Sequence, residues 1–86
     1  MNICFSAHAH SQLIERDITE EQVVETVLNP GQIPHLQGDL VVFHKIFMVN
    51  MKQYLFRVVA RKDQTSWFVV TAYKTSKISK YWRKDS

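Results

Sequence analysis

The feature that most constrains the fold is a series of three apolar, β-branched and aromatic runs in the second half of the chain. They span residues 40–49, 54–61 and 66–74, and short polar segments at residues 50–53 and 62–65 separate them. Runs of this composition, joined by such short connections, are typical of neighbouring antiparallel strands. We therefore expect an antiparallel meander.

The middle run alternates between two sets of side chains, as expected for a strand with one buried face. Leu55, Arg57, Val59 and Arg61 form one set, and Tyr54, Phe56, Val58 and Ala60 form the other. In the last run the alternation predicts a face with Trp67, Val69, Thr71 and Tyr73, opposite Phe68, Val70, Ala72 and Lys74. We expect one sheet face to pack against helices and the other to present Arg, Thr and Tyr side chains.

Helix signals are confined to the N-terminal third of the chain. Ser6 is a suitable N-cap for a helix over about residues 7–16. Thr19 and Gln22 have the spacing of a capping box, which predicts the start of a second helix. The sequence Asn-Pro-Gly at residues 29–31 ends that helix.

The remaining segments carry weaker signals. Residues 2–5 are expected to be a short strand or an extended lead-in, residues 32–39 a loop, and the basic, aromatic residues 75–86 an added strand or a turn of helix. An 86-residue chain has room for one core and one domain. The predicted fold class is α+β, with two N-terminal helices packed on a three- to four-stranded antiparallel sheet.

Composition favours a cytoplasmic protein without a membrane partner. Cys4 is the only cysteine, so it has no internal disulfide partner, and its apolar neighbours predict a buried thiol. No stretch approaches 18 uninterrupted apolar residues, and the N-terminus lacks the pattern of a secretory signal.

Charge is divided unevenly along the chain. Residues 1–40 carry one basic and six acidic side chains, net −5, whereas residues 41–86 carry ten basic and two acidic ones, net +8. Aromatic residues are interleaved with the basic half, and cations with flat rings are what single-stranded RNA needs for its phosphates and unstacked bases. A solvated basic surface is the other interpretation of this pattern.

The chemistry that fits these residues is cleavage of RNA without a metal ion or cofactor. The four histidines lack the paired spacing of a zinc site, and the chain has no glycine-rich phosphate loop. Attack by the 2′-hydroxyl of RNA needs a general base, a general acid and cations near the phosphate. The candidate catalytic residues are His8, Arg57, Thr71 and Tyr73. The candidate RNA-binding residues are Arg16, Lys45, Arg61, Lys77 and Lys80.

Each candidate also has a purely structural interpretation. His8 fits a histidine packed at a helix start, and Arg57 with Arg61 fits a solvated sheet face. Thr71 and Tyr73 are ordinary strand formers. The alternative to an endoribonuclease is therefore a non-catalytic module that binds RNA or a protein with the same basic face.

Two parts of the chain resemble a small uncharacterised domain family of bacteria and archaea. Residues 6–9 (SAHA) and 15–23 (ERDITEEQV) are similar to its opening pattern, S-x-H-A-x-x-R-x-x-x-R-G-I-S-x-E-x-V. Residues 69–73 (VVTAY) and 77–82 (KISKYW) are similar to its last strand and tail. The layout in turn resembles the RelE, BrnT and colicin-type ribonuclease superfamily. That resemblance implies a toxin that a small acidic antitoxin or immunity protein neutralises.

Two positions depart from the family pattern. Gln12 stands where the pattern has its first arginine, which implies weakened activity if that arginine binds phosphate; Arg16 matches the second arginine. Asp17 stands where the pattern has glycine, and we expect Asp17 to make the turn because aspartate tolerates left-handed backbone geometry.

Overall fold

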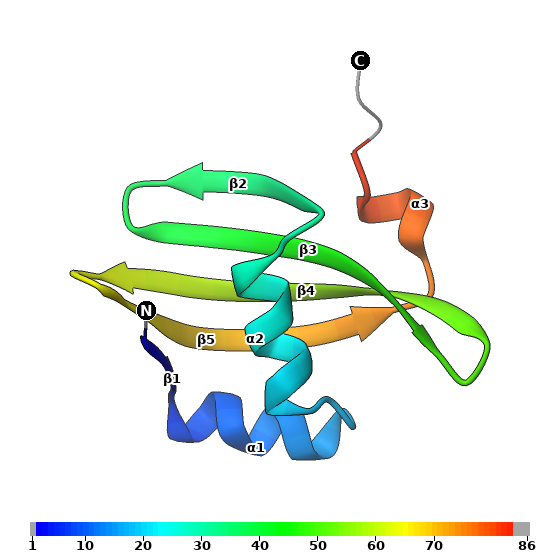
Figure 1. The fold of residues 1–86 in the computed structure, drawn as a ribbon, viewed down its shortest axis with the longest axis horizontal. Helices are drawn as coiled ribbons and strands as arrows, with labels where there is room; N and C mark the ends of the chain where they lie inside the picture. The colour runs from blue at the N-terminus through cyan, green and yellow to red at the C-terminus, as the bar shows by residue number, and fades with distance from the viewer. Residues whose placement is uncertain (1, 84–86) are drawn as a thin grey trace.

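The computed structural model describes residues 2–83 and shows a five-stranded mixed sheet with helices (Figure 1). In chain order the elements are β1 (Asn2–Phe5), α1 (Ala7–Glu15), α2 (Glu20–Leu28), β2 (Gln32–Gln37), β3 (Leu40–Val49), β4 (Lys52–Asp63), β5 (Ser66–Thr75) and α3 (Ile78–Tyr81). The strands lie in the order β1-β5-β4-β3-β2. None of the helices in residues 2–83 is long and apolar enough to cross a membrane.

The expected meander is confirmed, because β3, β4 and β5 pair antiparallel in sequence order. The expectation of three to four strands, all antiparallel, was wrong. β2 occupies the segment predicted to be a loop, and β1 pairs parallel with β5. β2 lacks apolar alternation and has a register shift between Gln32 and His35, so its signal is weak; it forms because β3 supplies the hydrogen-bond partners.

The core lies between one sheet face and the first two helices. Fully buried residues of β4, Phe56, Val58 and Ala60, contact this core as predicted from the alternation. From the helices the core includes Ala9, Leu13, Val23 and Val27, and from the turn between them it includes Ile18. Each of these helices begins with the predicted cap: Ser6 accepts from the backbone N–H of Ala9, and Thr19 with Gln22 forms a capping box.

A β-bulge overturns part of the predicted face assignment on β5. Val59 pairs with Thr71, but Ala60 pairs with Val69, so Val70 is an extra residue on this strand. Val69 and Ala72 therefore both reach the helix-side core, whereas simple alternation had placed them on opposite faces.

Two local expectations have opposite outcomes. Asp17 has a φ of 55° and makes the left-handed turn between α1 and α2, as predicted. The thiol of Cys4 is exposed, so the prediction of a buried thiol was wrong. Cys4 faces Phe68 of β5, which is also exposed, so both side chains lie on a side of the sheet that the core does not cover. The tail forms the short helix α3, and residues 84–86 of the predicted tail segment lie outside the described residues.

Candidate active site

Three polar side chains form one row across the sheet face opposite the helix-side core, which we call the open face. His44 of β3 lies directly opposite Arg57 of β4, and Arg57 lies directly opposite Tyr73 of β5. Facing pairs on adjacent strands point to the same side of a sheet. The strand register thus brings together Arg57 and Tyr73, two of the four predicted catalytic residues.

The guanidinium of Arg57 is held from three directions. Its Nε donates a 2.7 Å hydrogen bond to Nε2 of His44, and its Nη1 donates to the hydroxyl of Tyr73. The ring centroids of Tyr73 and Tyr81 lie 5.3 and 4.5 Å from Cζ of Arg57, within the range of cation–π contacts. Within residues 2–83, Nη2 of Arg57 makes no hydrogen bond. Nη2 is thus the nitrogen of this half-buried cation that could donate to a phosphate oxygen.

His44 is the buried base of this row, with only 1% of its surface exposed. Burial, followed by the nearby charges of Arg57 and Arg83, lowers the pKa of His44 from 6.5 to about 4. The ring is therefore neutral near pH 7. Since Nε2 accepts from Arg57, the ring proton is on Nδ1, which is buried and has no hydrogen-bond partner among the described residues.

A second polar cluster joins α1 to β5. Thr71 Oγ1 donates to Oε1 of Gln12 at 2.5 Å, and Gln12 Nε2 donates to Nε2 of His8 at 2.8 Å. Arg16 Nη1 lies 3.4 Å from Thr71 Oγ1 and donates to the carbonyl oxygen of Ala72 at 2.8 Å. Gln12 in the middle of α1 and Arg16 at its C-cap therefore both contact one short stretch of β5. His8 reaches this stretch only through Gln12 and is itself exposed.

Strand β5 connects the two clusters. Thr71 belongs to the α1 cluster and Tyr73 to the Arg57 row, and the two residues alternate with buried Ala72. They consequently lie on the same side of the strand. No hydrogen bond within residues 2–83 links His8 directly to Arg57.

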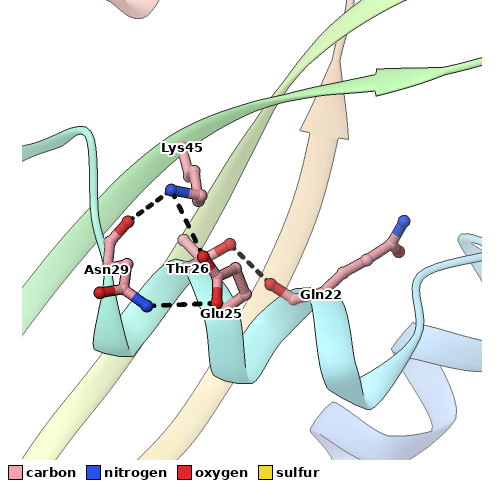
Figure 2. A network of polar contacts seen from close by, with 5 residues as sticks. All are labelled: Gln22, Glu25, Thr26, Asn29 and Lys45. Carbon is pink, nitrogen blue, oxygen red and sulfur yellow. Dashed lines mark hydrogen bonds and ion pairs between the residues drawn. The ribbon is translucent and has the colours of Figure 1, made fainter.

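Lys45 lies on the other side of the sheet, next to α2. Its Nζ donates to the carbonyl oxygen of Asn29 at 2.7 Å and lies 3.7 Å from Oε2 of Glu25 (Figure 2). Asn29 also donates to Glu25, and Thr26 one turn before it donates to the carbonyl of Gln22. The structure thus separates Lys45 from the Arg57 row and uses it to close the end of α2.

Arg61, Lys77 and Lys80, the remaining predicted RNA-binding residues, belong to neither polar cluster. Arg61 Nη1 is 3.6 Å from Oδ2 of Asp39, and both side chains are more than half exposed. Lys77 precedes α3, and Lys80 Nζ lies 5.4 Å from the ring centroid of Tyr81. Lys77 and Lys80 are exposed.

Sequence reasoning missed the roles of His44 and Tyr81. His44 was one of four histidines without a distinguishing motif, and only its pairing with Arg57 in the β3–β4 register shows its place. Tyr81 reaches Arg57 because the chain turns back after β5 into α3. Among residues 2–83, no group of three or more His, Cys, Asp or Glu side chains is arranged to hold a metal ion.

Comparison with known proteins gives one match. A family model described as "Domain of unknown function (DUF4258)" matches residues 5–74, which include His8, Gln12, Arg16, His44, Arg57, Thr71 and Tyr73. No curated protein and no solved structure matches the chain.

Proposed function

We propose that this chain, which belongs to the DUF4258 family, is a cytoplasmic endoribonuclease that cleaves single-stranded RNA without a metal ion. The observation that carries the proposal is the row of His44, Arg57 and Tyr73 on the open face. It places a cation beside a phenol, and Thr71 on the same side of β5 connects through Gln12 to His8 of α1.

The proposed reaction gives each candidate a role. RNA displaces Gln12 from Nε2 of His8, and this nitrogen then accepts the proton of the 2′-hydroxyl. The 2′-oxygen bonds to phosphorus, and the bond from phosphorus to the 5′-oxygen breaks. Tyr73 donates the proton that the leaving 5′-oxygen takes up, and the products are a 2′,3′-cyclic phosphate and a 5′-hydroxyl end. Arg57 and Thr71 stabilise the charge on the pentacovalent phosphate.

The toxin interpretation is part of the same proposal. It extends, by analogy of fold alone, the resemblance that we infer between the sequence layout and RelE, BrnT and colicin-type ribonucleases. The net charge of +8 on residues 41–86 supports a small acidic antitoxin or immunity protein as the partner, because charge complementarity speeds association and favours that partner over others.

The test is cleavage of a single-stranded RNA in the presence of EDTA. We expect 2′,3′-cyclic phosphate ends, and we expect His8→Ala to lose roughly 10²-fold of the rate while keeping the fold. His10→Ala is the matched control, because Nδ1 of His10 lies 3.2 Å from Oε2 of Glu20. His10 therefore belongs neither to the Arg57 row nor to the polar cluster between α1 and β5. Equal rates for His8→Ala and His10→Ala would contradict the role of His8, and cleavage abolished by EDTA would contradict the metal-free mechanism.

One observation favours a binding module as the second candidate. Two nitrogens of Arg57 and the hydroxyl of Thr71 already have protein partners. Gln12→Arg, which restores the residue of the family pattern, should leave cleavage equal or raise it. If the wild type and Gln12→Arg both bind RNA and leave it intact, the ribonuclease proposal fails and RNA binding remains.

A further inference from the structure

The geometry points to His44 as the positioning residue for Arg57: its ring holds the guanidinium in the orientation that leaves Nη2 for an RNA phosphate. This inference rests on the proposed function, because it assigns the group that prepares Arg57 to contact RNA. His44 itself is buried and touches no substrate.

Three residues define the orientation of Arg57. The bond from Nε to His44 Nε2 fixes one edge of the planar guanidinium, and the bond from Nη1 to Tyr73 fixes the adjacent corner. Tyr73 and Tyr81 both lie near its Cζ. Since the guanidinium is rigid and planar, two fixed nitrogens determine where the third one points.

The acceptor role requires a neutral His44 ring. Among the described residues, the charged groups near His44 are Arg57, which faces it from β4, and Arg83 of the C-terminal segment. From β2 it faces uncharged Gln32, while Tyr73 and Tyr81 contact Arg57. Both charged groups in this set are cations, and together with burial they oppose protonation of the ring. A protonated ring would lose the lone pair that accepts from Arg57 and would repel the guanidinium.

The test compares two substitutions of His44. His44→Gln keeps a carbonyl oxygen that can accept from Arg57 and does not titrate, whereas His44→Phe keeps a planar ring without an acceptor. His35→Phe is the matched control, because His35 is an exposed histidine on β2. The readouts are the NMR signal of the Arg57 Nε–H group, assigned by its loss in Arg57→Lys, and the affinity and cleavage rate for single-stranded RNA.

We expect a hydrogen-bonded Arg57 Nε–H signal in the wild type, His44→Gln and His35→Phe at pH 7, and its loss by rapid exchange in His44→Phe. RNA cleavage should fall at least about tenfold in His44→Phe, because a misdirected cation loses transition-state contacts, and should be largely restored in His44→Gln. In the wild type the hydrogen-bonded chemical shift of this signal should be lost as the pH falls toward 4, and in His44→Gln it should stay constant.

Each contrary result has a separate meaning. A protected Arg57 signal in folded His44→Phe, or equal RNA cleavage by His44→Phe and the wild type, would overturn the positioning role. Should His44→Phe fail to fold, the pH series of the wild type and His44→Gln decides the question, and identical series overturn it. If no variant cleaves RNA but binding and the Nε–H signal follow the expected pattern, the ribonuclease proposal fails while His44 still positions Arg57.

Discussion

Lys45 Nζ donates a 2.7 Å hydrogen bond to the carbonyl oxygen of Asn29, the residue that caps the C-terminus of α2. Lys74 does the same for α1, donating at 2.9 Å to the carbonyl of Asp17 just beyond the helix. Phe56 lies between the two lysines in one cross-strand row. Because the C-terminal end of a helix carries partial negative charge, these two cations of the basic half stabilise the packing of the helices on the sheet.

Substitution Lys45→Met should therefore lower stability more than it lowers RNA affinity. We expect a loss of about 0.5–1 kcal/mol in the free energy of unfolding, from the helix terminus and its hydrogen bond. Urea unfolding measures this loss, with exposed Lys80→Met as the control. If RNA affinity falls further in Lys45→Met than in Lys80→Met, Lys45 contributes to RNA binding and this prediction is contradicted.

The salt dependence of RNA binding should report the cations of the open face. Each phosphate of a single strand that the protein neutralises releases bound counterions. It thereby contributes about 0.7 to the magnitude of the slope of log affinity against log salt concentration. Arg57→Ala combined with Arg61→Ala should flatten the slope, as measured by fluorescence anisotropy of a labelled RNA. An unchanged slope, or binding insensitive to salt in the wild type, would favour a protein partner over RNA.

Acid should destabilise the protein through His44. Its pKa is about 4 when folded and 6.5 in the ordinary state, so between these values the unfolded chain binds a proton that the folded chain excludes. The contribution of neutral His44 to the free energy of unfolding is complete above pH 6.5. It falls by roughly 3 kcal/mol in total as the pH drops toward 4. Urea unfolding at pH 7 and at pH 4.5 measures how much free energy of unfolding is lost on acidification. This loss should be smaller in His44→Gln than in the wild type, and equal losses would contradict the role of His44.

Gly31→Ala should displace Trp82. A Cβ at Gly31 would lie 2.8 Å from Cη2 of Trp82, closer than real Cβ contacts, so the indole must shift. The indole N–H signal of Trp82, assigned with Trp82→Phe, should move while that of Trp67 stays. Gly38→Ala is the control, since Gly38 has open space around it and its φ of +62° introduces backbone strain alone. An unmoved Trp82 signal in Gly31→Ala would show that the indole does not pack on Gly31.

Local sequence patterns predicted the parts of the fold that depend on neighbouring residues. The cap at Ser6, the capping box at Thr19 and the left-handed turn at Asp17 each involve contacts within a few residues. The alternation in β4 likewise predicted that Phe56 and Arg57 lie on opposite faces of the sheet, because successive side chains of a strand point to opposite sides. It also marked Arg57 and Tyr73 as polar residues of one sheet face.

The sequence by itself determined which segments become α1, α2, β3, β4 and β5, and which side of β4 faces the helix-side core. Only the tertiary structure decided that His44 faces Arg57, that the bulge at Val70 turns Val69 and Ala72 to the same core, and that Lys45 closes α2. The physical reason is that register and strand order depend on hydrogen bonds between residues far apart in the chain. Such bonds leave no periodic trace in either partner segment.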